Sequence, residues 1–460
     1  MLSDLNAYIR AIAKKHHVPA ISVAVYMNGS MKKAACGVLN VETQVEADVD
    51  SVFQIGSISK VFTASLIMDL VDAGKIELDR PVREYLPAFH VADPGATERI
   101  TVRNLLSHTS GLVSDLYVGG EDADGSNLIE RYVDQCFLLP QVHRDFGKRF
   151  SYSNAGYVIA GRIVEVATGM SWAGAVERLI LRPLEMTQTS VRPAQTLRFR
   201  AAMGHLIKGN DPSNLRVETA AACYMPQALA PAGATLAMTA ADLIKFGRAH
   251  WDNGRSASSR PWLTETSIAA MQYPQVSIPF PTLLSEDGWG LGWALSRSRG
   301  PRAFGHAGGT IGQQSLLEVY PEFGLVLAAQ LNGMALGGAP VLQDILDDVF
   351  YQATGRGPGH TGERPQLGPL TRFTGTFGVV GWRIRIDERG GQLQAELVAD
   401  AGGDLPPQSF KLTRIADNTF EARTEGGVRA DYFTFLDPDS LGIPQYLFSA
   451  YRLHPRVASS

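Results

Sequence analysis

The sequence predicts an α+β fold followed by a smaller all-β domain, and three observations lead to this prediction. Runs rich in β-formers lie at both ends of a long first region, with helical patterns between them, which is typical of an antiparallel sheet packed by helices. A segment rich in Gly and Pro then interrupts the pattern. Beyond it, apolar and polar residues alternate between turn residues. We therefore expect a main domain over residues 1–353, a linker over 354–369 and a small, nearly closed β-barrel over 370–460.

The elements of the main domain are predicted in chain order from hydrophobic periodicity and from turn and cap residues. The N-terminal segment reads as an amphipathic helix that Ser3 caps, and Asn28-Gly29 marks a hairpin between two strands. An apolar helix begins at Ser57, and a short helix in "ITVRNLLSHTSGL" is expected to end at Gly111. Residues 112–150 read as loop-rich.

Two more helices and two strands complete the main domain. Helical spacing returns in "NAGYVIAGRIVEVATG", where Gly169 stops the helix, and Thr239 is expected to cap another helix. The run from Gly305 through "LLEVYPEFGLVLAAQLN" reads as two adjacent strands with a turn near Pro321.

Composition excludes several classes of function. With 460 residues and a net charge of −4, the chain lacks the basic balance of a nucleic-acid-binding protein. No apolar run is long enough for a membrane span, and the first residues do not form a signal peptide, so we expect a cytoplasmic protein. The three cysteines are distant from one another and are expected to be reduced thiols.

The apolar helix carries a lysine in its first turn, where the helix dipole disfavours a cation by about 0.3–1 kcal/mol. Ser57 and Lys60 are three residues apart, so on a helix they share a face and can touch. Burial in an apolar wall lowers the pKa of a lysine, and a neutral amine can take the proton of a serine hydroxyl. The alternative is a capping serine with a lysine that reaches solvent. Ser30 and Lys33 repeat the same spacing beside the predicted hairpin turn.

Two more short motifs follow in the sequence: Tyr152-Ser-Asn154 in "RFSYSNAGY" and His306-Ala-Gly308 in "FGHAGGTIG". Together with Ser57-x-x-Lys60, they resemble the motif set of the serine β-lactamase and penicillin-binding-protein superfamily. The resemblance is closest to its class C-like branch, which includes D-aminopeptidases, DD-peptidases and carboxylesterases, and it covers roughly residues 5–350. It implies a β-lactamase-like fold, in which helices flank an antiparallel sheet beside an all-helical subdomain, with a C-terminal lipocalin-like barrel.

The resemblance implies a role for each motif residue. Ser57 is expected to form the acyl-enzyme, while Lys60 and Tyr152 share the proton transfers as one coupled unit. Asn154 is expected to orient Lys60 and to touch the substrate. The strand that carries His306 and Gly308 is expected to supply an oxyanion donor through the backbone N–H of Gly309, beside that of Ser57.

Other copies of the short motifs are disfavoured by their context. Tyr26-Met-Asn28 lies before the nucleophile in a strand, and His360-Thr-Gly362 lies in the linker. Without the other motifs, a Tyr and an Asn at a helix start would read as a packed ring and a cap. His108 is interpreted as a structural residue away from the chemistry. The remaining histidines form no metal-binding pattern, so neither a metal nor a cofactor is expected.

The sequence departs from the family pattern at His306, which stands where β-lactamases have a lysine associated with the carboxylate of the antibiotic. A histidine is mostly neutral at pH 7 and holds an anion less strongly. We therefore expect an intracellular hydrolase of a small ester, amide or short peptide, with homo-oligomerisation left open and the barrel gating the Ser57 pocket. A transacylase, a penicillin-binding sensor or β-lactamase, and a scaffold without activity are the alternatives.

Overall fold

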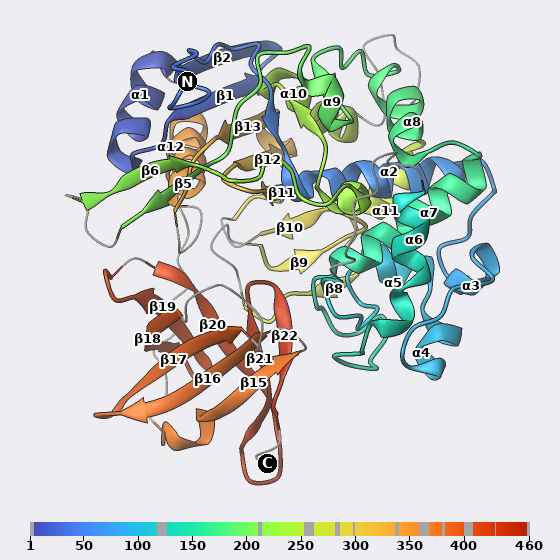
Figure 1. Cartoon of the computed structure of the whole chain (residues 1–460), viewed down its shortest axis with the longest axis vertical. Helices are drawn as coiled ribbons and strands as arrows, with labels where there is room; N and C mark the ends of the chain where they lie inside the picture. The colour runs from blue at the N-terminus through green and yellow to red at the C-terminus, as the bar shows by residue number, and fades with distance from the viewer. Residues whose placement is uncertain are drawn as a thin grey trace.

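The computed structural model describes residues 4–116, 127–209, 214–252, 262–280, 286–297, 300–335, 340–357, 368–379, 382–399, 408–427 and 429–457. Its described part contains a mixed α/β region and a separate C-terminal β-sheet (Figure 1). The predicted linker lies mostly outside the described residues, and so does the alternative motif at His360.

The main sheet has eight antiparallel strands in the order β2-β1-β13-β12-β11-β10-β9-β8. Side chains alternate between the two faces of each strand. Along β13, Leu325 and Leu327 therefore join one apolar core, while Val326 and Ala328 join the other. The strands are β1 Ala20–Met27, β2 Ser30–Gly37, β8 Val276–Ser277, β9 Gly288–Trp289, β10 Ala294–Ser296, β11 Ala303–Gly309, β12 Gln314–Tyr320 and β13 Leu325–Leu331.

Helices cover both faces of this sheet. Helices α1 and α12 pack in one core, and α2, α7 and α10 pack in the other. The helices are α1 Leu5–His16, α2 Ser59–Asp72, α3 Val82–Tyr85, α4 Pro94–Arg99, α5 Val102–Leu106, α6 Leu128–Asp134, α7 Asn154–Thr168, α8 Trp172–Val176, α9 Pro193–Thr196, α10 Ala240–Trp251, α11 Glu265–Met271 and α12 Pro340–Thr354. Two small sheets join β3 Phe53–Gln54, β7 Ala237–Met238 and β4 Thr189–Ser190, and β14 Met334–Ala335, β5 His205–Lys208 and β6 Arg216–Thr219.

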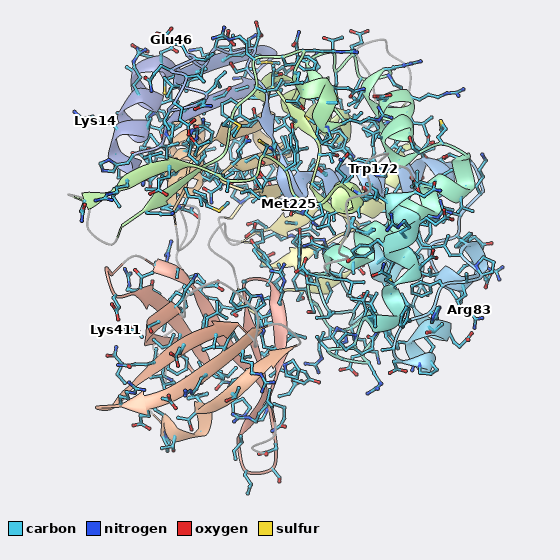
Figure 2. The ribbon with its side chains drawn as sticks, in the orientation of Figure 1. Lys14, Glu46, Arg83, Trp172, Met225 and Lys411 are labelled. Atoms are coloured by element: carbon cyan, nitrogen blue, oxygen red, sulfur yellow. The ribbon has the colours of Figure 1, made fainter. Side chains whose placement is uncertain are left out.

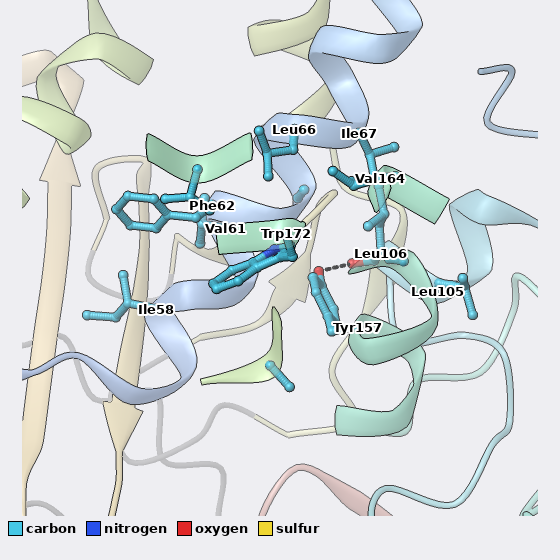
Figure 3. Packing of buried hydrophobic residues seen from close by; sticks show 14 of the residues in the cluster. Ile58, Val61, Phe62, Leu66, Ile67, Leu105, Leu106, Tyr157, Val164 and Trp172 are labelled. Atoms are coloured by element: carbon cyan, nitrogen blue, oxygen red, sulfur yellow. Dashed lines mark hydrogen bonds between the residues drawn. The ribbon is translucent and has the colours of Figure 1, made fainter. Parts of the chain in front are cut away.

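The helical part is built around α2, whose side chains are buried nearly all round. Figure 3 shows Val61, Phe62 and Leu66 of this helix packed among neighbouring helices. The hydroxyl of Tyr157 on α7 donates to the carbonyl of Leu106 at the end of α5, at 2.7 Å. This bond ties together the two helices that lead into the site described below.

Several local predictions are confirmed. The Asn28-Gly29 turn joins β1 and β2 with both residues at positive φ, as a two-residue hairpin requires. Gly169 ends α7 in the left-handed conformation. The Thr239 side chain accepts from the backbone N–H of Asp242 and caps α10. All three cysteines are free thiols.

Three local predictions are wrong. The side chain that caps α1 is Asp4, which accepts from Ala7 N–H, rather than Ser3. Helix α5 ends at Leu106, well before Gly111, because His108 adopts a positive φ that the right-handed helix cannot continue. The residues from Gly305 onward form three strands rather than two, since Gly312 turns the chain between β11 and β12.

The C-terminal sheet is a single antiparallel meander of eight strands. A bridge between Phe377 and Arg456, with a bond from Val457 N–H to the Thr376 carbonyl, brings its first and last strands together as a nearly closed barrel. The strands are β15 Gly375–Val379, β16 Trp382–Arg389, β17 Gln392–Ala399, β18 Gln408–Ala416, β19 Thr419–Thr424, β20 Arg429–Pro438, β21 Pro444–Ser449 and β22 Arg452–Pro455.

An apolar cluster joins the barrel to the main domain. Phe448 and Leu453 of the barrel pack with Phe150, Tyr152 and Trp289 of the main domain, and all five side chains are buried. Figure 2 shows side chains throughout both parts, with Trp172 among the helices and Lys411 on the outside of the barrel. No helix among the described residues is both long enough and apolar enough to span a bilayer.

Candidate active site

Ser57 lies in a 3₁₀ turn, Gly56–Ile58, that runs directly into α2. Gly56 has a φ of +53°, and a Cβ there would come within 2.6 Å of the backbone nitrogen of Gly309. A side chain at position 56 would therefore push the turn away from β11. The glycine allows the backbone around Ser57 to lie directly against the strand that carries Gly309.

Lys60 begins the buried face of α2, and its side chain is 0% exposed. Its Nζ donates to Ser57 Oγ at 3.1 Å and to the carbonyl of Ala232 at 2.5 Å. Burial holds the pKa of this amine well below the usual lysine value; the charge of Asp115 opposes this shift and that of Arg452 adds to it. The expected alternative, a lysine that reaches solvent, is therefore wrong.

Tyr152 precedes α7, and its ring centroid lies 4.7 Å from Lys60 Nζ. A side-chain hydrogen bond joins Tyr152 to Ser57. Burial raises the pKa of the phenol above its ordinary value, while the bond to Ser57 and the charge of Arg452 act in the opposite direction. The hydroxyl, the amine and the phenol thus converge from two distant segments, and burial favours the protonated phenol and the neutral amine.

Asn154 begins α7, two residues after Tyr152. Its amide nitrogen donates to Asp115 Oδ1 at 2.6 Å, and the other carboxylate oxygen of Asp115 accepts from Arg452 at 3.4 Å. Burial alone would raise the pKa of Asp115, but the charge of Arg452 and the bonds from Asn154 and Ser114 hold it below its usual value. Asn154 therefore connects α7 to an ion pair at the margin of the site, while Lys60 Nζ donates to Ser57 and Ala232.

Strand β11 supplies the opposite wall through His306, Gly308 and Gly309. A Cβ at Gly308 would come within 1.9 Å of the Ile55 carbonyl, so this glycine also permits close packing against the turn before Ser57. His306 Nδ1 donates to the Ala307 carbonyl at 2.5 Å, which leaves Nε2 as an acceptor. Burial lowers the pKa of His306 to about 3, so the imidazole is neutral.

Two aromatic side chains that the sequence did not single out for the site complete the wall around Tyr152. The His108 ring stacks on the Tyr152 ring with centroids 4.2 Å apart, and the Trp289 ring meets it edge-on at 5.8 Å. His108 Nδ1 accepts the backbone N–H of Ser153 at 3.0 Å. The expectation that His108 lies away from the chemistry is therefore wrong, because the chain after α5 turns back under Tyr152.

Asp115, Tyr451 and Arg452 also reach the site, and nothing in the sequence predicts this. Asp115 has no helical or strand periodicity around it, and Arg452 lies in the second domain. The Tyr451 carbonyl accepts the backbone N–H of Tyr152 at 2.9 Å. These contacts depend on how the two domains dock, and local sequence patterns do not predict that docking.

The alternative motif copies are placed elsewhere. Ser30 and Lys33 lie on β2, where both residues are exposed. Tyr26 packs against Trp251 and under Arg248. Among the described residues, no group of His, Cys, Asp and Glu side chains is arranged to hold a metal ion.

The arrangement is suited to nucleophilic catalysis by Ser57. An amine whose pKa is lowered by burial touches the hydroxyl and is suited to accept its proton, and a protonated phenol can donate to a leaving group. Ser57 and Gly309 lie on two segments packed together, as an oxyanion hole made from their backbone N–H groups requires.

Comparison with known proteins agrees with this geometry. The Beta-lactamase family model matches residues 5–349. Penicillin-binding protein 4 of Amycolatopsis lactamdurans is 39% identical over 348 residues, which covers 75% of this chain and 87% of that protein. These matches confirm the predicted superfamily and β-lactamase-like fold.

Two groups of solved structures are also similar. The crystal structure of SurE with D-Leu has a TM-score of 0.76 at 26% identity and covers 98% of both chains, so it includes the barrel region. The D-amino acid amidase from Ochrobactrum anthropi SV3, complexed with L-phenylalanine amide, has a TM-score of 0.61 at 25% identity and covers 77% of this chain and 99% of that chain. The chain belongs to the Beta-lactamase family, whose relatives are serine hydrolases.

Proposed function

We propose that this chain hydrolyses a small amide, peptide or ester through an acyl-enzyme on Ser57. The observation that carries the proposal is the 3.1 Å contact between the Ser57 hydroxyl and the buried amine of Lys60. A lysine with a lowered pKa can act as a general base at neutral pH, whereas a solvated lysine cannot.

The proposed reaction has two steps. Lys60 takes the proton of Ser57 as the hydroxyl oxygen attacks the substrate carbonyl, and the backbone N–H groups of Ser57 and Gly309 stabilise the oxyanion. Tyr152 donates a proton to the leaving amine or alcohol as its bond to the acyl carbon breaks. Water then attacks the acyl-enzyme with the same groups in reversed roles, which releases the acid and restores Ser57.

The substrate class that we favour is an amide or ester of a D-amino acid. Support comes from two similar structures, one of which is a D-amino acid amidase and the other a complex with D-Leu. The neutral His306 also favours this class over β-lactam hydrolysis, because the position does not supply the cation that β-lactamases place there.

A transacylase is the second candidate, in which an amine or alcohol replaces water in the second step. An apolar cover over Tyr152, made by Trp289, Phe448 and Leu453, supports it because such a cover limits the access of water to the acyl group. A cytoplasmic location and homo-oligomerisation stay predictions.

The test is turnover of a matched panel: p-nitroanilides of D- and L-leucine and D- and L-phenylalanine, p-nitrophenyl esters and a chromogenic cephalosporin. We expect D-aminoacyl substrates to be preferred by at least tenfold in kcat/KM, and Ser57→Ala to abolish turnover. Intact mass after a brief reaction should show one acyl group, which Ser57→Ala should lack. Equal turnover by the Ser57→Ala variant would overturn the proposal, and product partitioning to an added D-amino acid would favour the transacylase.

A further inference from the structure

The segment that leads into α7 is held by hydrogen bonds from three consecutive backbone N–H groups. Ser151 N–H donates to the His108 carbonyl at 2.9 Å, and Tyr152 N–H donates to the Tyr451 carbonyl at 2.9 Å. Ser153 N–H donates to Nδ1 of the His108 ring at 3.0 Å. Residue 108 therefore binds the chain on both sides of Tyr152.

The His108 ring also lies against the Tyr152 ring, with centroids 4.2 Å apart and planes inclined by 27°. His108 is fully buried, because three more aromatic rings enclose it: Phe150, Tyr157 and Trp289. Stacking restricts the plane of the phenol ring, while the two hydrogen bonds restrict the backbone that carries it. One residue thus contacts both the ring and the backbone at position 152.

This placement depends on an uncommon backbone conformation at position 108. Its φ is +57°, in the left-handed region that His, Asn and Asp enter more readily than most side chains. The residues just before it are fixed by the Tyr157 hydroxyl, which donates to the carbonyl of Leu106 at 2.7 Å (Figure 3). The chain after α5 therefore turns back and brings the imidazole against the phenol.

The chemistry of the ring indicates that position 108 does more than fill space. Burial holds the pKa of His108 well below its usual range, so the ring is neutral, and the bond from Ser153 places its one proton on Nε2. This Nε2 is buried and has no hydrogen-bond partner in the described part of the chain. A buried donor without a partner destabilises a fold, and phenylalanine would fill the same apolar space without one. The benefit of histidine therefore lies in the acceptor at Nδ1.

We propose that His108 is a positioning residue that aims the Tyr152 phenol at the reacting atoms, because it holds both the adjoining backbone and the face of the ring. Its imidazole transfers no proton. This inference rests on the proposed function, in which the phenol protonates the leaving group. A misplaced phenol should slow the release of a group that needs a proton and should hardly affect a group that leaves as a stable anion.

Two variants separate the acceptor from the ring. His108→Phe keeps an aromatic ring without an acceptor, whereas His108→Asn keeps an acceptor on the carbon that carries Nδ1 and also tolerates positive φ. Hydrogen exchange, read by mass spectrometry with fragmentation, measures protection of the Ser153 amide without any substrate. We expect this amide to exchange about tenfold faster or more in His108→Phe and within about threefold of the parent in His108→Asn. His90→Phe, at an exposed histidine, is the control and should match the parent.

Turnover tests whether His108 acts through the phenol. The substrates are the p-nitrophenyl ester and the p-nitroanilide of D-leucine, which share an acyl group but release a stable phenolate or an amine that needs a proton. In His108→Phe, kcat/KM should fall by about tenfold or more for the anilide and by less than about threefold for the ester. His108→Asn should recover part of the loss on the anilide.

A double-mutant cycle with Tyr152→Phe completes the kinetic test. In that background the phenol is absent, so His108→Phe should lower turnover of the anilide by less than about a further twofold. A residue that only supports the fold would instead lower turnover by the same factor in both backgrounds and on both substrates.

Each outcome decides something. Unchanged protection of the Ser153 amide in His108→Phe overturns the inference, whatever the enzyme turns over. Equal losses on the ester and the anilide also overturn it, as does a full loss in the Tyr152→Phe background. If His108→Phe does not fold, a folded His108→Asn with an unprotected Ser153 amide contradicts the role of the acceptor. If the parent turns over neither substrate, the proposed function fails, and hydrogen exchange alone decides whether His108 holds the segment at position 152.

Discussion

The chain contains the same serine-lysine spacing twice, and the two copies differ in everything except the spacing. Ser57 and Lys60 lie where a 3₁₀ turn passes into α2, so positions three apart share one face and the side chains touch. Ser30 and Lys33 lie on β2, where positions three apart point to opposite faces.

The two serine-lysine pairs also differ in the burial of their lysines. Lys33 is exposed and forms an ion pair with Asp50, with 3.7 Å between the charged atoms. Lys60 is enclosed, and its enclosure favours the neutral form. A short motif therefore acquires chemistry only from the element that carries it and from the wall around it.

The largest expected effect separates the two serines. Ser57→Ala removes the hydroxyl to which Lys60 Nζ donates. It should lower kcat by about 10⁴-fold or more, as loss of a catalytic nucleophile does. Ser30→Ala should leave kcat within about twofold, because a lone surface substitution rarely affects catalysis. The measurement is steady-state turnover of the best substrate in the panel. A comparable loss in both variants would contradict the assignment.

Substitution of the two lysines should change kcat/KM by very different factors, nearly as different as those for the two serines. Lys60→Met removes the base while it keeps the volume, and we expect kcat/KM to fall by about 10²–10⁴-fold, the usual range for general-base catalysis. Lys33→Met should be close to neutral. Intact-mass kinetics of acylation would distinguish loss of the base from loss of binding, and rapid acylation of Lys60→Met would rule out the lysine as the base.

The pH dependence of kcat/KM tests whether Lys60 acts in its neutral form. Since activity needs neutral Lys60, kcat/KM should fall about tenfold per pH unit below the pKa of this amine in the free enzyme. That pKa is lowered by burial, so the acid limb should lie well below 10.5, and the raised pKa of Tyr152 keeps the phenol protonated above its ordinary range. An acid limb near the ordinary pKa of lysine would show that the amine is solvated.

The smallest effect is on stability and has the opposite sign to the effect on activity. Lys60→Met should stabilise the fold by about 1–4 kcal/mol at pH 7, because burial lowers the pKa of Lys60 in the folded parent, and lowering that pKa by one unit costs about 1.4 kcal/mol relative to the unfolded chain. With a lowered pKa, the folded state binds fewer protons than the unfolded state between the two pKa values, so stability of the parent should rise with pH in that window. Urea unfolding at several pH values measures this, and an equal rise in Lys60→Met would assign it to another group.

Local chemistry made much of the main domain predictable. The Asn28-Gly29 turn, the Gly169 stop and the Thr239 cap each follow from the residues in place, and the Ser57 and Lys60 contact follows from helical spacing. The end of α5 could not be predicted from the sequence, because the left-handed turn at His108 depends on the packing of its ring against Tyr152 and Phe150. The contributions of Asp115 and Arg452 depend on the docking of two domains, which no local pattern records.

The hairpin that ends in β22 also sets an order of events during synthesis. The nucleophile is translated early, while Tyr451 and Arg452 follow only after the whole main sheet and most of the barrel have left the ribosome. Until then, the backbone N–H of Tyr152 lacks its carbonyl partner and the surface around the phenol is uncovered. A nascent chain would thus hold the paired Ser57 and Lys60 side chains before it holds the hairpin that covers Tyr152.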